Sequence, residues 1–348
     1  MTGRAQKGTR AVVVTGAGGV GKTTISAALA VAAARAGRRT LVLTVDPARR
    51  LTTALGIEMS NEPEPHPDAP NLWGAMLDAT ASWHEVVRRH ADPEVAERLI
   101  DNQFFDAATS HFPASQSFAA AEEAATYLDA RAWDLVVVDT PPAAGGIEFF
   151  TAPASMSDLV GGRVLRWLTG ARLPGRRFLF NRTAKPMLRL ADQVLGSNLL
   201  EQIAEFFMDL RTTYDGVSKR ARQIERHMRR ATTLVVTTSD PGPMAETLRF
   251  FRALPEVASP PAAVVFNRTL PESWIDAEVP ADTPAALATN LERWAEESRM
   301  QRAARRELGE RHGVPIVTVP WRQHPPTDLE ALADLADVEG LRRIWEES

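Results

Sequence analysis

The chain has 348 residues, of which 44% are hydrophobic, and a formal net charge of −4. This length allows one large α/β domain or two smaller ones, and the weakly acidic balance argues against a nucleic-acid partner. The chain has no cysteine, which excludes disulfides, thiolate metal sites and cysteine nucleophiles and fits a reducing cytoplasm.

The N-terminal part predicts a strand, a glycine-rich loop and a helix in succession. After residues 1–10, which we interpret as a disordered tail, Ala11–Val14 predicts the strand and Thr24–Arg35 the helix. The loop between them, GAGGVGKTT, fits the phosphate-binding pattern G-x-x-x-x-G-K-[ST]. A phosphate needs many donors in a small volume. Glycines let successive backbone N–H groups turn towards it, and the helix adds its free N–H groups and positive dipole end.

Strands and helical regions then alternate along the chain. Further strands are predicted at Arg38–Asp46, Leu72–Leu77, Trp133–Asp139, Thr232–Thr238, Ala262–Phe266 and Pro315–Val319. Helical regions are predicted at Thr80–Arg131, Ala154–Arg230, Met244–Arg252 and Pro284–Arg311, and a loop at Glu62–Pro70. This alternation favours an α/β fold with a mostly parallel sheet covered by helices on both faces. Ligands of such sheets bind beyond the carboxyl ends of the strands, where the glycine loop, Asp46, Asp139 and Asn267 are expected.

Four residues are candidates for catalysis and metal binding. Lys22 supplies a positive charge for the β- and γ-phosphates, and Thr23 supplies a hydroxyl for Mg²⁺. Asp139 ends an apolar strand in the arrangement of a carboxylate that positions Mg²⁺, the alternative being an ordinary aspartate at a strand end. Asp46 could orient, or take a proton from, a water that attacks the γ-phosphate, the alternative being an N-cap of the next helix.

Four motifs in order, GAGGVGKTT, TVDPARRL, VVVDTPP and VVFNR, resemble those of the ArsA family of ATPases, and the resemblance covers nearly the whole chain. That family includes arsenite-pump ATPases and the ATPase that targets tail-anchored membrane proteins. The resemblance implies a P-loop nucleoside-triphosphatase domain over residues 11–348, with a helical subdomain from about 80–130 and 154–230. It also implies ATP and Mg²⁺ as cofactors. The expected protein is a cytoplasmic dimer that hydrolyses ATP and acts on a membrane-associated partner or client.

The resemblance further implies roles for individual residues. Asp46 corresponds to the aspartate that activates the attacking water, and Asp139 to the aspartate near Mg²⁺. Asn267 corresponds to the asparagine that reads adenine, because a carboxamide can pair with the base. Pro320 lies where the adenine loop begins, and Glu246 corresponds to a glutamate near the nucleotide. The phosphate cradle corresponds to Gly18, Gly19, Val20, Gly21, Lys22, Thr23 and Thr24.

The chain departs from the family pattern at Ala17, where the family has a lysine that reaches the partner's phosphates across a dimer. A homodimer of this chain would lack that cation at the transition state. Three alternatives remain. A heterodimer with a paralogue could carry the lysine, Arg49 or Arg50 could replace it, or the chain could be a weakly hydrolysing switch that recruits a membrane partner. Of these we favour the heterodimer.

Other sequence features bear on metals and partners. Because the chain has no thiolate and its seven histidines lack metal-type spacing, we expect no zinc. Residues Leu159–Ala191 hold eight basic residues and no acid between apolar ones. This suits an anionic membrane surface, and hence peripheral attachment, or an acidic partner, the alternative being a packed helix with a solvated basic face. A positioning ATPase similar to MinD or ParA is a further alternative that the acidic C-terminal end disfavours.

Overall fold

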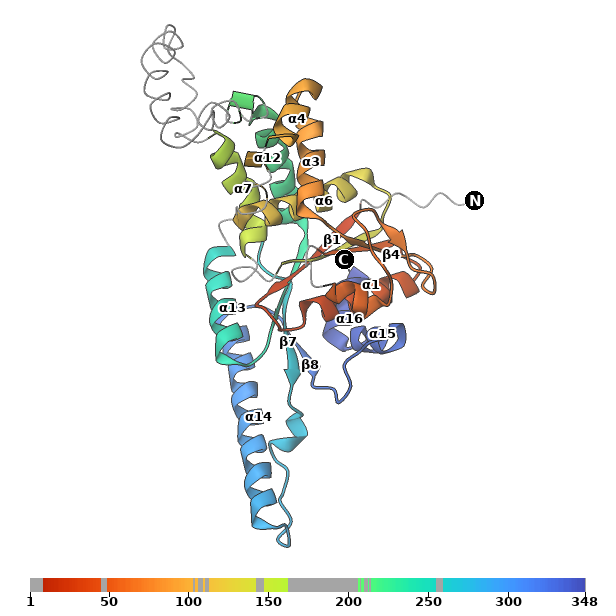
Figure 1. The fold of residues 1–348 in the computed structure, drawn as a ribbon. Coiled ribbons are helices and arrows are strands. Elements are labelled where there is room, and N and C mark those ends of the chain that lie inside the picture. Colours follow the sequence, from red (N-terminus) through yellow and green to blue (C-terminus); the bar gives the residue numbers. More distant parts are fainter. Residues whose placement is uncertain are drawn as a thin grey trace, which may run out of the picture. The chain divides into compact units, whose positions relative to one another are not determined.

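The computed structural model describes residues 9–44, 49–102, 104–105, 109, 113–141, 147–161, 206, 208–209, 212, 214–254 and 259–347. The chain divides into two compact units (Figure 1). The sheet unit comprises residues 1–77, 126–150 and 227–348, and the helical unit comprises residues 78–125 and 151–226. The assignment of the helical unit as an inserted subdomain stays a prediction.

The sheet unit is built on an eight-stranded sheet of order β3-β4-β2-β5-β1-β6-β7-β8. All pairs of neighbours are parallel except β3 and β4, which confirms the predicted mostly parallel sheet. The strands are β1 (Arg10–Gly16), β2 (Thr40–Thr44), β3 (Glu64–Pro65), β4 (Leu72–Met76), β5 (Leu135–Asp139), β6 (Thr232–Thr237), β7 (Ala263–Thr269) and β8 (Ile316–Pro320). Strand β1 begins at Arg10, one residue before the predicted strand, and residues 1–8 of the predicted tail lie outside the described residues.

Helices cover both faces of this sheet. Figure 1 shows α1, α15 and α16 on one side of it and α13 and α14 on the other. The helices of the sheet unit are α1 (Lys22–Arg35), α2 (Arg50–Leu55), α13 (Pro241–Ala253), α14 (Ala285–His312), α15 (Leu329–Ala336) and α16 (Glu339–Glu347). The helical unit contains α3 (Ala79–His90) and α4 (Pro93–Ile100) and shares α6 (Pro113–Ala130), α7 (Ile147–Gly161) and α12 (Tyr214–Arg230) with the sheet unit. The sequence predictions missed α15, α16 and the edge strand β3, which lies inside the predicted loop 62–70, and α2 has Arg49 rather than Asp46 as its N-cap.

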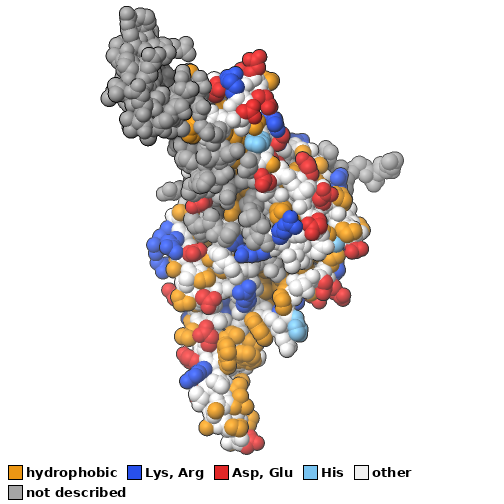
Figure 2. All heavy atoms as spheres, viewed as in Figure 1, with side chains coloured by type: hydrophobic (Ala, Val, Ile, Leu, Met, Phe, Trp, Pro, Cys, Tyr) orange, Lys and Arg blue, Asp and Glu red, His pale blue; other side chains and the backbone are white. Residues whose placement is uncertain are grey.

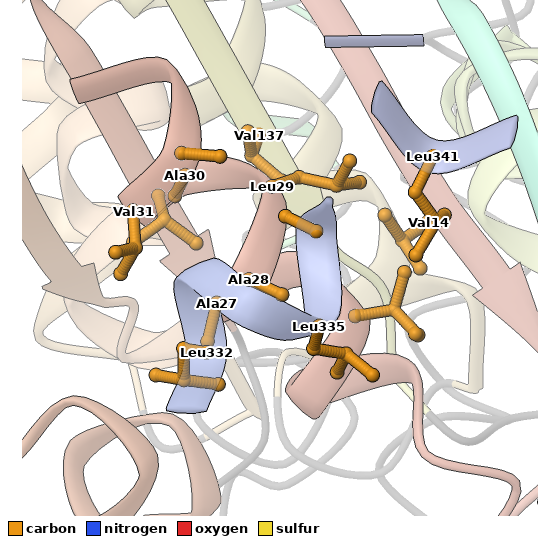
Figure 3. Close-up of a cluster of buried hydrophobic side chains, with 14 of the residues drawn as sticks. Val14, Ala27, Ala28, Leu29, Ala30, Val31, Val137, Leu332, Leu335 and Leu341 are labelled. Atoms are coloured by element: carbon orange, nitrogen blue, oxygen red, sulfur yellow. The ribbon is translucent and has the colours of Figure 1, made fainter. Parts of the chain in front are cut away.

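Helix α1 is buried along almost its whole length, and this fixes its N-terminus against the centre of the sheet. Every residue from Ile25 to Ala34 is buried, so the helix has core contacts all round rather than one wet face. Figure 3 shows its small side chains between Val14 and Val137 of the sheet and Leu332 and Leu335 of α15. Alanines allow this close approach, because they add little bulk between packed backbones.

A core substitution tests this packing. We expect Leu332→Ala to lower the free energy of unfolding by about 2–5 kcal/mol, because Leu332 is fully buried and its loss leaves a cavity against α1. The matched change Leu287→Ala should cost under about 1 kcal/mol, because Leu287 is 51% exposed. Urea unfolding followed by circular dichroism measures both variants, and equal losses would contradict the packing described.

The helical unit is held together by a buried charge network. The carboxylate of Glu122 on α6 is fully buried and pairs with Arg220 of α12 at 2.5 Å and with Arg89 of α3 at 3.1 Å. A buried carboxylate requires such partners, since an unpaired one would cost several kcal/mol, on the order of 3–5. His90 lies beside this network, and burial, followed by the charges of Arg220 and Arg89, lowers the pKa of its imidazole.

This environment predicts a loss of stability in acid. Because the pKa of His90 is lower in the folded state than in the unfolded state, the unfolded state binds more protons as the pH falls below the ordinary histidine pKa of about 6.5. The stabilising contribution is therefore complete above that pH and is lost as the pH falls towards the lowered folded-state pKa. We expect the unfolding midpoint in urea to fall as the pH decreases below about 6.5, and to fall less steeply in His90→Gln. Identical slopes in the two proteins would refute the role given to His90.

Candidate functional site

The glycine loop joins the central strand β1 to α1 and passes very close to its neighbours. Strand β1 ends at Gly16 and α1 begins at Lys22, with Gly21 as its N-cap. A Cβ atom on Gly16 would lie 2.0 Å from the carbonyl oxygen of Val236, and one on Gly21 would lie 2.2 Å from Nδ2 of Asn267. Both glycines also have positive φ angles, 144° and 98°. Glycine is therefore required here by close approach as well as by backbone conformation.

Lys22 places its ammonium at the start of the loop. The side chain is only 7% exposed, and Nζ donates hydrogen bonds to the carbonyl oxygens of Gly16 at 3.0 Å and Ala17 at 2.8 Å. The sequence of the first helical turn, Lys22–Ile25, holds no acidic residue that would compete for its N–H groups. A cation and a helix N-terminus therefore lie at one loop, which is the chemistry that an anionic phosphate needs.

Asp139 forms the second half of the site. Its carboxylate is 1% exposed and accepts hydrogen bonds from the hydroxyls of Thr23 at 2.8 Å, Thr44 at 3.1 Å and Ser26 at 3.4 Å. These hydroxyls come from α1 and β2, whereas Asp139 ends β5, so three elements fix its orientation. The prediction that Thr23 and Asp139 belong to one site agrees with this geometry, although their role as metal ligands stays a prediction.

Thr44 and Ser26 were not among the residues predicted from sequence. Ser26 lies three residues after Thr23, on the same face of α1, and that spacing could have identified it. Thr44 reaches Asp139 because β2 pairs with β5, and the sequence alone does not give the order of strands. Across the described ranges, no three His, Cys, Asp or Glu side chains gather into a group able to hold a metal ion.

Asn267 is brought to the glycine loop, although β6 separates β7 from β1. Its Nδ2 donates to the carbonyl oxygen of Val20 at 2.8 Å, and its Oδ1 accepts from the N–H of Arg268 at 2.9 Å. The carboxamide of Asn267 therefore packs against Gly21 and is bonded to the loop at Val20. Reading of an adenine base by Asn267 stays a prediction, and it would require these hydrogen bonds to rearrange or to be shared.

The other predicted site residues have varied positions. Pro320 is the exposed last residue of β8, and it is followed by Trp321, which is 55% exposed. Glu246 lies half-buried on α13. The predicted catalytic Asp46 lies outside the described residues, as do residues 142–146, which follow Asp139 closely in the sequence. In the phosphate loop, Gly18 and Gly19 are exposed, Val20 is buried, and Gly21 and Thr24 are half-buried.

The central parallel strand β1 leads through a glycine loop to a helix that begins with Lys22 and Thr23, and the neighbouring strand β5 ends in Asp139. This arrangement defines the P-loop class of nucleoside-triphosphatase folds. The family model described as anion-transporting ATPase, ArsA ATPase, matches residues 9–283. The chain therefore belongs to the anion-transporting ATPase family, which confirms the resemblance seen in its motifs.

Individual relatives share this similarity. A putative arsenical pump-driving ATPase of Halobacterium salinarum is 27% identical over 350 residues, covering 97% of this chain and 46% of the relative. An uncharacterised protein of Streptomyces coelicolor is 30% identical over 285 residues, covering 79% and 65% of the two chains. ATPase get3 of Schizosaccharomyces pombe is 26% identical over 191 residues, covering 55% and 53%. The chain spans about half the length of most of the curated relatives it matches.

Substitution of two loop glycines tests the close approach of the loop to β6. Gly16→Ala and Gly19→Ala both place alanine at a positive φ, 144° and 75°, but nothing lies within 4 Å of a Cβ on Gly19. We expect Gly16→Ala to lower the free energy of unfolding by at least about 2 kcal/mol more, because its methyl group meets a strand backbone. Denaturant unfolding measures the difference. A Gly16→Ala protein as stable as Gly19→Ala would show that the loop does not press against β6.

Proposed function

We propose that this chain binds ATP with Mg²⁺ at the loop between β1 and α1 and hydrolyses it to ADP and phosphate. The observation that carries this proposal is the pairing of two groups at the start of one helix. Lys22 presents an ammonium within the loop, and the next residue, Thr23, donates its hydroxyl proton to Asp139 at 2.8 Å. The first group suits phosphate oxygens and the second suits a hard divalent cation.

The phosphate half of the proposal rests on donors. The glycine loop and the first turn of α1 offer backbone N–H groups, and the buried packing of α1 holds them still. Lys22 is buried in the same loop and adds a full positive charge. We infer that the β- and γ-phosphates lie over this loop. Its alanine at position 17 is 4% exposed and adds no charge.

The magnesium half rests on the oxygen chemistry around Asp139. Because the Thr23 hydroxyl gives its proton to Asp139, the lone pairs of Thr23 Oγ1 are left for a cation. The carboxylate of Asp139, oriented by Thr44 and Ser26, supplies negative charge next to that oxygen. Hard oxygen donors of this kind fit Mg²⁺. When bound, the ion would neutralise charge on the β- and γ-phosphates.

Asp46 is the residue that we propose for the water. It follows Thr44 by two residues in the sequence. The proposal is supported by Thr44, the last residue of β2, which donates a hydrogen bond to Asp139 at 3.1 Å. In this proposal Asp46 orients the attacking water. The water oxygen bonds to the γ-phosphorus, the bond to the β,γ-bridging oxygen breaks, and Asp46 or the released phosphate takes the proton.

We further propose that the chain works in the cytoplasm as a dimer and drives a membrane-associated partner. The name of the Halobacterium salinarum relative, a putative arsenical pump-driving ATPase, supports the last of these points. A paralogue that carries the family lysine would supply the cation missing at Ala17. Ala17 also favours a second candidate function, a slowly hydrolysing nucleotide switch. Arg49 is a weak substitute for that lysine, because its guanidinium pairs with Glu58 at 3.4 Å and its side chain is 63% exposed. Among the described helices, none is both long and apolar enough to cross a membrane.

Two aspartates at opposite ends of β5 test the proposal. We expect Asp139→Asn to lower the rate of Mg²⁺-dependent phosphate release from ATP at least about tenfold, because the buried negative charge beside Thr23 is lost. The control Asp134→Asn changes an exposed aspartate just before the amino end of β5, where it accepts from the N–H of Arg39, and should leave the rate within about twofold. Equal rates in both variants would contradict the site.

Asp46→Asn separates the two candidate functions. An ATPase that uses Asp46 should lose its steady-state phosphate release in this variant while it still binds ATP. If phosphate release by Asp46→Asn equals that of the unmodified chain, the switch is favoured and the hydrolytic role of Asp46 is wrong.

A further inference from the structure

An apolar stripe lies exposed on the sheet unit, away from the glycine loop in sequence. Leu287, Leu291 and Trp294 follow one another at spacings of four and three residues on α14 and are 51%, 42% and 49% exposed. Trp274, in the short 3₁₀-helix Glu272–Trp274, is 38% exposed, and its ring centroid lies 6.1 Å from that of Trp294. We call these four residues the tryptophan stripe. Figure 2 shows hydrophobic side chains gathered over this end of the unit.

The stripe continues a face of α14 that is buried further along the helix. Ser298, Arg305 and Leu308 recur on the same face and are 2%, 5% and 2% exposed. Figure 1 shows that the N-terminal part of α14 projects beyond the strands that its C-terminal part covers. One face of α14 is therefore buried against the sheet in the C-terminal half of the helix and exposed in the N-terminal half. Two tryptophans and two leucines form a group here, whereas exposed apolar residues on an ordinary protein surface are scattered singly.

The surroundings of the stripe are strongly acidic. Residues 271–298 hold seven acidic residues and one arginine, a net charge of −6, although the whole chain has a net charge of only −4. Glu272 among them pairs with Arg305 at 2.8 Å. The exposed acids of this segment are Asp276, Glu278, Asp282, Glu292 and Glu296, and Glu296 pairs with Arg299 at 2.5 Å. An apolar centre with an acidic rim selects a ligand that is apolar on one face and basic at its edges.

We infer that the tryptophan stripe is a docking site for a basic amphipathic helix of a partner protein. The apolar face of that helix packs on Trp274, Leu287, Leu291 and Trp294, and its lysines or arginines meet the acidic rim. A second copy of this chain would bring a second acidic rim, and an anionic bilayer would repel the first one. Tryptophans near the centre of such a site contribute most of the binding energy.

A synthetic helical peptide tests the inference on the full chain. The probe is an 18-residue peptide of leucine and lysine with its leucines on one face, labelled with a fluorophore and titrated by anisotropy. We expect saturable binding that weakens as salt rises and that falls at least about tenfold in Trp294→Ala. The matched control is Met300→Ala. Met300 is 54% exposed, but its spacing of six residues from Trp294 puts it on another side of α14.

The rim has its own test. The double change Glu292→Gln and Glu296→Gln should weaken binding about threefold or more at low salt. Circular dichroism checks that each variant is folded, which the exposure of the changed side chains favours.

Several results would overturn the inference. These are equal binding of a peptide with glutamate in place of lysine, equal affinities of Trp294→Ala and Met300→Ala, and no binding at all. Two others would identify a different occupant. Self-association in sedimentation that Trp294→Ala abolishes would indicate a second copy. Binding to vesicles of anionic lipid that Trp294→Ala abolishes would indicate a membrane.

Discussion

The hydrogen bond from the Thr23 hydroxyl to Asp139, 2.8 Å long, joins the two halves on which the proposed chemistry depends. It connects the helix that follows the glycine loop to the strand next to β1. Both partners of this bond are held in place, because α1 is packed on nearly every side and β5 is fully buried. The position of the ammonium of Lys22, one residue earlier, follows from the same packing. The function that we propose for this loop therefore depends on the core beneath it.

Much of this arrangement could be predicted from the sequence, because local patterns specify it. The glycine loop, the apolar strands and the aspartate at the end of β5 are short continuous signals, and they led to the parallel sheet and to the Thr23–Asp139 site. The contact of Thr44 with Asp139 and that of Asn267 with Val20 depend on which strands are neighbours. Strand order is a property of the whole sheet, so no local pattern contains it.

Other differences have equally physical causes. The edge strand β3 is two residues long and contains a proline, so it has no apolar alternation that would distinguish it from a loop. Helix α14 could be predicted as a helix, but its pattern of leucines and tryptophan resembles that of an ordinary buried face. Only the structure shows that this face lies buried at Ser298 and Leu308 and exposed at Leu291.

The two proposed sites are independent in sequence and in chemistry. The glycine loop gathers positive charge for an anionic ligand, whereas the rim of the tryptophan stripe gathers negative charge. Isothermal titration of the purified chain with ATP and Mg²⁺, compared with a Lys22→Met variant, tests the central claim most directly. The account predicts saturable binding that weakens at least about tenfold in the variant, because Lys22 carries the one full charge inside the loop. No binding to the unmodified chain, or equal affinity in both proteins, would contradict it.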